Sequence, residues 1–288
     1  MKILRAEAMG FCFGVRDALA ATRSITDPGE VTIHGELVHN PTVAEELRRR
    51  GFASTEEDRR AVPETPAVLV TAHGISQRER RRLEAAGKRI VDTTCPLVTR
   101  AHDAAVALAA EGRLVLVVGK PGHVEVEGLT GDLSAFAVLR GPEDARDFGA
   151  GRLGLVAQTT TPPALFADTA ARVRELNPDA DLAIVDTVCQ PTRRRKEALA
   201  ALTREADLVI VVGGPNSNNT ARLAQTCREA GVPAHHVGGP ADLDPGWFVG
   251  IGTVGLTAGT STPDEVIEAV HRELERLATL PRRGVLTP

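Results

Sequence analysis

Three cysteines recur in similar short turns along this chain of 288 residues. The turns read GFCFGV around Cys12, DTTCPLV around Cys95 and DTVCQPT around Cys189. Each turn precedes a segment with a helical pattern, and the start of a helix stabilises the thiolate, which is the form that binds metals. Three converging thiolates suit either zinc with one open position or an iron–sulfur cluster in which one iron lacks a protein thiolate. The alternative is three buried structural cysteines.

Each cysteine turn is followed by two further segments whose spacing also repeats. A strand with a polar loop comes second (HGELVHNP, VGKPGHVEVEG, VGGPNSNNT), and a strand with a small-residue turn comes third (VTAHGIS, VAQTTTP, LTAGTSTP). The second segment lies 22, 24 and 24 residues after its cysteine, and the third 61, 63 and 69 residues after it. This register predicts three similar α/β units, and a pseudo-threefold axis would bring the cysteines together. Cys227 lies outside the register, in a helical pattern, and we expect it in the core.

The polar loops hold the second group of candidate residues. His39, His73 and His123 each lie in one of them. The equivalent turns carry small hydrogen-bonding groups, namely Asn40, Ser76, Glu125, Thr159, Thr160, Ser217, Asn219 and Ser261. Such groups at helix starts favour phosphate. Two structural alternatives stay open: residues 216–219 form a turn, or Ser261 or Thr262 caps the last helix, where Thr262, Pro263 and Glu265 resemble a capping box.

Glu125 lies in the motif GHVEVEG, between His123 and Glu127. A carboxylate beside a metal cluster and an anion would have a shifted pKa and could transfer protons. The alternative is an ordinary surface glutamate. Neither the Gly-rich dinucleotide fingerprint nor the P-loop motif is present, so a nucleotide enzyme is weakly supported.

The elements that must position these residues alternate between strands and helices. Continuous apolar runs, typical of strands covered on both faces, occupy 67–72, 88–92, 113–119, 153–158, 182–187, 207–214 and 250–259. Helical patterns occupy 97–111, 192–205, 217–230 and 263–278. This alternation predicts α/β architecture with mainly parallel sheets. We expect three domains at 13–95, 96–188 and 189–278, with a strand in 1–12 joining the third and a flexible tail at 279–288.

Composition narrows the class of protein. Hydrophobic residues make up 42% and charged residues 25% of the chain, with a net charge of −4 and a pI of about 6.1. These values give no electrostatic footprint for nucleic acid, and the arginine clusters at 48–50 and 80–82 resemble solvated helix faces. The apolar runs are too short for a membrane span, and the start lacks a secretory leader. We therefore expect a cytoplasmic protein with four free cysteines.

At these residues the chain resembles the 4-hydroxy-3-methylbut-2-enyl diphosphate reductase family, whose members complete the methylerythritol phosphate route to isoprenoids. The matching motifs are GFCFGV, ELVHNP, AHGIS, DTTCPLV, GHVEVEG, QTT, TVCQPT, NSNNT and TAGTSTP, which run from residue 10 to residue 263. The resemblance implies a cloverleaf of three α/β domains around a 4Fe–4S cluster. It also implies reductive removal of the hydroxyl group, which gives isopentenyl and dimethylallyl diphosphate.

The resemblance assigns roles to individual residues. It implies that Cys12, Cys95 and Cys189 hold the cluster and leave one iron open. Glu125 would relay protons to the departing hydroxyl group, with Thr159 positioning it and His123 beside it. The diphosphate of the allylic substrate would be held by His39, His73, His123, Ser217, Asn218, Asn219 and Ser261. Ferredoxin or flavodoxin would supply the electrons.

Two positions depart from the family pattern. The family commonly has N-S-S-N where this chain has Asn218 in place of the second serine, and an amide can still donate to phosphate. The family also often has R-Q-x-A where this chain has Arg195 and Lys196, whose added charge would disturb the helix packing or face solvent. These departures leave room for a paralogue that binds or reduces another small diphosphate. The three thiolates with an open site leave a second alternative, a zinc hydrolase.

Overall fold

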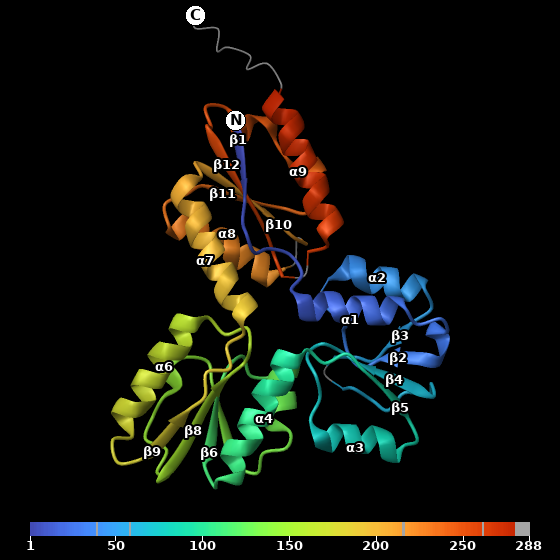
Figure 1. Cartoon of the computed structure of the whole chain (residues 1–288), viewed down its shortest axis with the longest axis vertical. Helices are drawn as coiled ribbons and strands as arrows, with labels where there is room; N and C mark the ends of the chain where they lie inside the picture. Colours follow the sequence, from blue (N-terminus) through green and yellow to red (C-terminus); the bar gives the residue numbers. More distant parts are fainter. Residues whose placement is uncertain (39, 58, 215–216, 261, 280–288) are drawn as a thin grey trace, which may run out of the picture. The chain divides into compact units, whose positions relative to one another are not determined.

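The computed structural model describes residues 1–38, 40–57, 59–214, 217–260 and 262–279 (Figure 1). The chain divides into two compact units. One holds Met1–Cys12, a short segment at 40–41 and the described residues from Arg194 onward; the other holds Phe13–Val38 and Thr42–Arg193. We call them the A unit and the BC unit, after the sheets described next.

The fold contains three four-stranded parallel sheets. Sheet A has the order β1-β12-β10-β11, sheet B the order β3-β2-β4-β5 and sheet C the order β7-β6-β8-β9. Their strands are β1 (Lys2–Arg5), β2 (Val31–Ile33), β3 (Ala53–Ser54), β4 (Ala67–Val70), β5 (Arg89–Asp92), β6 (Leu114–Val118), β7 (Phe136–Leu139), β8 (Arg152–Ala157), β9 (Asp181–Ile184), β10 (Leu208–Val212), β11 (Ala234–Val237) and β12 (Thr253–Ala258). The three sheets share one strand order, with β1 from the chain start as the fourth strand of sheet A, which confirms the predicted fold class of similar α/β units.

Helices connect the strands, as parallel pairing requires. They are α1 (Phe13–Arg23), α2 (Pro41–Arg49), α3 (Gln77–Ala85), α4 (Pro96–Ala110), α5 (Val124–Thr130), α6 (Pro163–Leu176), α7 (Gln190–Glu205), α8 (Asn218–Glu229) and α9 (Asp264–Thr279). Short 3-10 turns lie at Pro28–Glu30, Pro142–Asp144, Pro240–Asp242 and Pro245–Phe248. None of the helices in the described ranges is long and apolar enough to cross a membrane.

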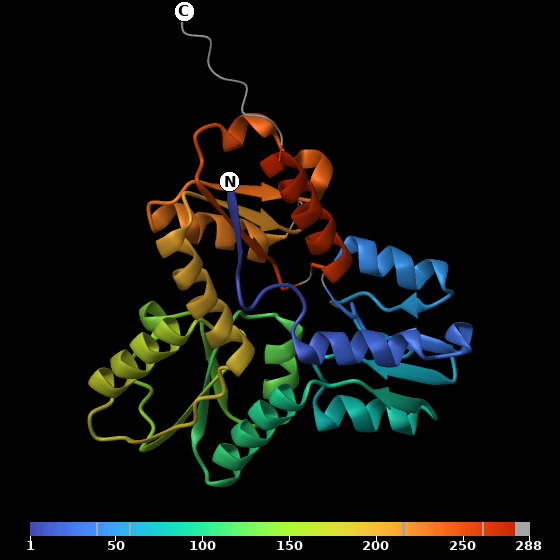
Figure 2. The same cartoon turned by 45° about the horizontal axis from the view of Figure 1, so that its top comes forward.

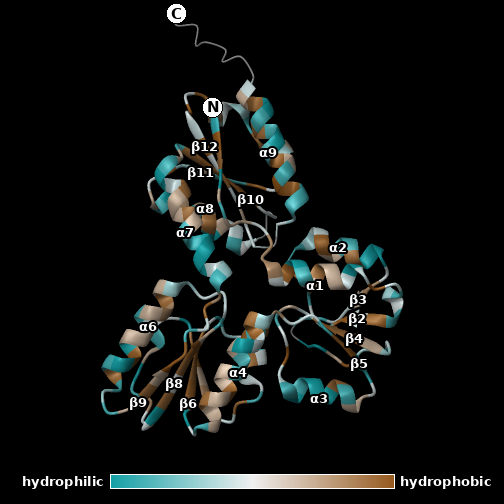
Figure 3. Ribbon diagram, in the orientation of Figure 1, coloured by the Kyte–Doolittle hydropathy of each residue, from teal (hydrophilic) through white to brown (hydrophobic). Residues whose placement is uncertain are grey.

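Alternate residues of the central strands pack on opposite faces of each sheet. In sheet C, Leu116 and Val118 pack with α6, whereas Val115 and Val117 pack with α4 and α5. Both views of the cartoon show α4 and α6 on opposite sides of this sheet (Figures 1 and 2). The strands are accordingly among the most hydrophobic segments of the chain (Figure 3). The continuous apolar runs thus reflect burial on both faces.

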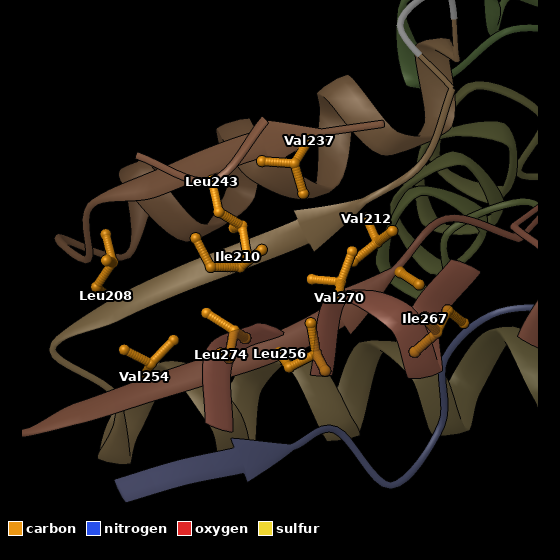
Figure 4. Packing of buried hydrophobic residues seen from close by; sticks show 11 residues of the cluster. Leu208, Ile210, Val212, Val237, Leu243, Val254, Leu256, Ile267, Val270 and Leu274 are labelled. Atoms are coloured by element: carbon orange, nitrogen blue, oxygen red, sulfur yellow. The ribbon is translucent and has the colours of Figure 1, made fainter. Parts of the chain in front are cut away.

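Sheet A follows the same rule. Leu208, Ile210 and Val212 face α9, against which they form one apolar cluster (Figure 4). Val209 and Val211 face α7 and α8. A fully buried aliphatic side chain contributes roughly 1.5–3 kcal/mol, so these clusters hold the strand ends, and the loops that follow them, in fixed places.

The cysteine turns occupy equivalent places in the topology. Cys12, Cys95 and Cys189 follow β1, β5 and β9, each an edge strand, and directly precede α1, α4 and α7. Each turn therefore carries the chain from the edge of one sheet into the helix that leads to the next. The sequence predicted three domains, at 13–95, 96–188 and 189–278. The structure divides into two compact units, with sheets B and C in one of them, so these three boundaries stay a proposal.

Candidate active site

Two of the three register cysteines lie in the BC unit with similar backbone support. Cys95 is the N-cap residue of α4, and its N–H donates to the carbonyl of Ala72 at 3.1 Å. The N–H of Cys189 donates to the carbonyl of Thr159 at 2.9 Å, directly before α7. Both thiols are partly exposed. A thiol at a helix start is placed where the helix dipole stabilises the thiolate.

The backbone after the first cysteine comes close to Cys95. A Cβ atom built on Gly14 would lie 2.5 Å from the Sγ atom of Cys95. Any side chain at residue 14 would therefore fill the space beside this thiol. The glycine of the GFCFGV motif keeps that space available.

Cys12 and Cys227 belong to the A unit and have different surroundings. Cys12 is partly exposed, whereas Cys227 is fully buried between α8 and sheet A, as its helical pattern predicted. Burial raises the pKa of the Cys227 thiol to about 11, so it stays protonated. Within the described ranges, no three His, Cys, Asp or Glu side chains are grouped as for a metal ion.

Glu125 is the most unusual acid of the BC unit. Its side chain is only 2% exposed, although α5 begins just before it. The backbone N–H of Thr159 donates to Oε1 of Glu125 at 2.5 Å, and the Thr159 hydroxyl also bonds to the carboxylate. Burial raises the pKa of Glu125 to about 7, with the hydrogen bonds from Thr159 offsetting part of the shift. The carboxyl group can thus hold and release a proton near neutral pH.

Two of the predicted histidines lie together beside this acid. His123 is the N-cap of α5, and its Nδ1 accepts the N–H of Glu125 at 3.1 Å. This hydrogen bond places the ring proton on Nε2 in neutral His123, which makes Nε2 a donor. The ring of His73, from the turn after β4, meets the ring of His123 edge to face, with centroids 5.6 Å apart. The structure therefore brings together two histidines from loops that follow strands of two different sheets, β4 of sheet B and β6 of sheet C.

A second contact fixes the same junction. Asp132, just after α5, accepts the N–H of Gln77 at 2.6 Å and of Arg78 at 2.8 Å, which are the first residues of α3. Nε2 of His102 lies 2.8 Å from the same carboxylate. A negative charge at the start of α3 stabilises the helix dipole. Asp132 thereby links the turn that carries His73 to the helix that carries Glu125.

In the A unit, Ser217 is held by one neighbour. Ser217 is the N-cap of α8, and its Oγ accepts both the N–H of Thr220 at 3.2 Å and the hydroxyl of Thr220 at 2.8 Å. Thr220 is fully buried, and a Cβ atom on Gly213 or Gly259 would lie 2.2 Å from its Oγ1. Both lone pairs of the Ser217 hydroxyl are occupied, so its own proton is directed to another acceptor.

The other predicted binding residues are described in part. Asn219 lies in the first turn of α8 and is exposed. His39, Ser261 and the side chain of Asn218 lie outside the described residues. The Thr262 hydroxyl donates to the carbonyl of Val212 at 3.0 Å, and α9 begins two residues later, at Asp264. The cap proposed for the last helix stays a prediction, because Ser261 lies outside the described residues.

Two charged residues that follow the third cysteine, Arg195 and Lys196, lie in different environments. Arg195 is partly buried, and its guanidinium donates to the carbonyl of Gly10. Lys196 is exposed. Arg195 thus helps to hold the backbone just before Cys12 within the A unit, while the charge of Lys196 faces solvent.

Sequence reasoning missed three residues that support the site. Thr192 lies beside Cys189, Thr220 holds Ser217, and Asp132 links α5 to α3. An alignment of the three repeats on their cysteines would have revealed Thr192, because Cys12 and Cys95 are followed at the same distance by Val15 and Val98. Asp132 and Thr220 give no such signal, since their roles depend on backbone atoms.

Comparison with known proteins places the chain in a family. The family model described as LytB protein matches residues 3–275. A 4-hydroxy-3-methylbut-2-enyl diphosphate reductase of Solidesulfovibrio magneticus is 36% identical over 96% of this chain and 99% of its own length. The protein of the same name from Chromohalobacter salexigens is also 36% identical, over 96% of this chain and 90% of its own length.

Solved structures agree. One, described as (E)-4-hydroxy-3-methyl-but-2-enyl diphosphate reductase, the terminal enzyme of the non-mevalonate pathway, is 32% identical, with a TM-score of 0.73 over 96% of this chain and all of that one. The E-1-hydroxy-2-methyl-but-2-enyl-4-diphosphate reductase of Plasmodium falciparum, 24% identical with a TM-score of 0.82 over 97% of this chain and 88% of that one, shares the fold. On this evidence the chain belongs to the LytB protein family.

Proposed function

We propose that this chain is an oxidoreductase that converts 4-hydroxy-3-methylbut-2-enyl diphosphate into isopentenyl and dimethylallyl diphosphate. The observation that carries the proposal is the buried Glu125, whose raised pKa of about 7 suits proton delivery and whose partner Thr159 also holds the backbone of Cys189. Thr159 thus connects the acid, Glu125, to a candidate metal ligand, Cys189. The names of the relatives at 36% identity support the same reaction.

The cysteines fit an iron–sulfur cluster by their chemistry. Cys12, Cys95 and Cys189 are partly exposed thiols at the starts of helices, and the space beside the Cys95 sulfur is left open by Gly14. Soft thiolate ligands select iron–sulfur clusters or zinc. We place the reaction in the cytoplasm, where glutathione keeps thiols reduced. A 4Fe–4S cluster held by these three cysteines, with one iron open, would supply electrons and a Lewis-acidic iron.

In this proposal Glu125 is the proton donor. The overall reaction removes the hydroxyl group as water and consumes two electrons and two protons. Protonated Glu125 delivers one proton to the departing oxygen, because hydroxide is a poor leaving group. The second proton adds to one of two carbons of the allyl group, which gives the two products. Thr159 holds the carboxyl group in place with its N–H and hydroxyl group.

The diphosphate would be held by hydrogen-bond donors in loops and at the starts of helices. His123 presents Nε2–H, and Ser217 directs its proton away from Thr220. We assign the same role to His39, His73, Asn218, Asn219 and Ser261. Such donors orient the substrate through its unreacting end, so that binding energy positions the carbon–oxygen bond. Electrons would come from ferredoxin or flavodoxin, since the sequence has no nicotinamide-binding fingerprint.

Anaerobic purification followed by iron and sulfide analysis and a reductase assay tests this proposal. The assay uses the hydroxylated allylic diphosphate with a strong one-electron donor. We expect about four irons per chain and formation of both products. Iron without turnover would indicate a paralogue with another substrate, and zinc in fresh anaerobic protein would replace the reductase with the three-thiolate hydrolase. Cys227→Ser is the matched control for Cys95→Ser and Cys189→Ser, because it should retain iron whereas they should lose it.

A further inference from the structure

The third cysteine turn differs from the other two at one position. The residue three places after the cysteine is Val15 in the first turn, Val98 in the second and Thr192 in the third. Valine and threonine have nearly the same shape, but only threonine carries a hydroxyl group. The three turns therefore have equivalent places in the topology but differ in the polarity of the side chain at this position.

The hydroxyl group of Thr192 lies between two acceptors. Its Oγ1 is 3.1 Å from the Sγ of Cys189 and 3.3 Å from the carbonyl oxygen of Thr159. That carbonyl already accepts the N–H of Cys189 at 2.9 Å. A hydroxyl group has one proton to donate, and a metal-bound cysteine is a thiolate, whose charge makes it the stronger acceptor. With a metal bound to Cys189, the proton of Thr192 would therefore point to the sulfur.

We propose that Thr192 is a positioning residue that donates a hydrogen bond to the metal-bound sulfur of Cys189 and raises the reduction potential of the cluster. This inference rests on the proposed function. Hydrogen bonds to the sulfur atoms stabilise the reduced, more negative state of an iron–sulfur cluster, and outer-shell partners of this kind orient the ligands. The other two turns have valine at this position, which offers no hydroxyl group to the sulfur of Cys12 or Cys95.

The same contacts tie this sulfur to the acid. The carbonyl of Thr159 accepts the N–H of Cys189, and its N–H donates to Glu125. The candidate cluster ligand Cys189 and the proton donor Glu125 thus bind the carbonyl and the N–H of the same residue, Thr159. Loss of the Thr192 hydroxyl group leaves the bond between Thr159 and Glu125 in place, so it should change the potential and not the proton donor.

The test is the midpoint potential of the cluster, measured by a spectroscopically monitored redox titration of the anaerobic protein. Thr192→Val keeps the shape of the side chain and repeats what the chain has at Val15 and Val98. Thr192→Ser keeps the hydroxyl group. Thr161→Val is the matched control, because Thr161 lies in the same turn as Thr159 but donates to the carbonyl of Val118 and not to a cysteine.

We expect Thr192→Val to retain its iron and sulfide and to shift the midpoint potential to a more negative value. Thr192→Ser and Thr161→Val should keep the wild-type value. An unchanged potential in iron-replete Thr192→Val, or an equal shift in Thr161→Val, would overturn the inference while leaving the proposed function intact. A wild-type protein without iron would instead overturn the proposed function as well.

A second measurement needs no variant. The iron–sulfur stretching bands of the wild-type cluster, recorded by resonance Raman spectroscopy in H2O and in D2O, report a hydrogen bond to a cysteine sulfur. We expect one cysteine-linked band to shift in D2O. A spectrum without such a shift would contradict the inference even if Thr192→Val failed to assemble its cluster.

Discussion

The loops after β6 and β10 occupy the same place in their sheets and end in the same way. Each follows an inner strand, β6 between β7 and β8 and β10 between β11 and β12. Each leads into a helix whose N-cap lies four residues after the glycine that follows the strand: His123 after Gly119, and Ser217 after Gly213. Their chemistry differs. The β6 loop places a carboxyl group with a pKa of about 7 in the first turn of α5, whereas the β10 loop presents a hydroxyl group oriented by Thr220.

This difference shows how one α/β unit serves two purposes. Parallel strands place their following loops at one edge of a sheet, and helix starts supply N–H groups there. In sheet C the first helical turn buries Glu125 and so favours a held proton, whereas in sheet A the turn has neutral donors suited to an anion. Substitutions in the two loops should therefore affect different kinetic constants.

The largest expected effect is on turnover by Glu125→Gln. Removal of a general acid costs roughly 10²–10⁴-fold in rate. We expect kcat to fall by this factor, with little change in KM and with the iron content preserved. Glu127→Gln is the matched control, because Glu127 is exposed in the same helix. Turnover near the wild-type rate in Glu125→Gln would remove this acid from the reaction.

The same substitution should stabilise the fold at alkaline pH. Folding raises the pKa of Glu125 from 4.5 to about 7, so its favourable contribution is complete below pH 4.5 and is lost as the pH rises to 7. Above pH 7 the buried charge costs about 3 kcal/mol, which an amide avoids. Anaerobic urea unfolding at pH 5 and pH 9 should show the advantage of Glu125→Gln growing with pH. An advantage independent of pH would contradict the raised pKa.

A smaller effect is expected for Ser217→Ala. Hydrogen bonds to charged groups contribute about 1.5–3 kcal/mol, so we expect KM for the diphosphate to rise by about 10-fold or more while kcat changes less. Loss of the N-cap should also lower the free energy of unfolding by about 1 kcal/mol. Steady-state kinetics check the first effect, and Ser217→Thr should restore it. A change confined to kcat would remove the contrast between the two loops.

The smallest effect is expected for Asp132→Asn. This change weakens the attachment of α5 to the start of α3, and with it the contact between His73 and His123. One weakened hydrogen bond of this type is worth about 1 kcal/mol, which predicts a rise in KM of a few fold. Asp103→Asn serves as a control, because Asp103 is exposed on α4. If KM is unchanged, Asp132 supports the fold alone.

Much of the fold was predictable because its signals are local. The runs at 113–119 and 207–214 predicted β6 and β10, since a strand buried on both faces must be apolar throughout. The register of the cysteines predicted similar α/β units. The strands β3, β7 and β11 were not predicted. β3 has only two residues, both exposed, and β11 has two histidines between its apolar ends, so neither forms a continuous apolar run.

The candidate site was predictable by residue type and only partly by contact. Glu125 is buried, so the alternative of a surface glutamate is wrong, and burial rather than a neighbouring cluster or anion raises its pKa to about 7. Its role in proton transfer stays a prediction. The contacts of Thr192, Thr220 and Asp132 were not predictable, because each depends on a partner brought close by the fold. The set of cluster ligands and the full set of diphosphate contacts stay predictions.

The most direct test of the account is a single turnover. Anaerobic, chemically reduced protein is mixed with the hydroxylated allylic diphosphate, and the products are quantified for the wild type and for Glu125→Gln. We expect isopentenyl and dimethylallyl diphosphate from the wild type, and bound but unconverted substrate in Glu125→Gln at the same iron content. Equal product from both proteins, or none from an iron-replete wild type, would contradict it.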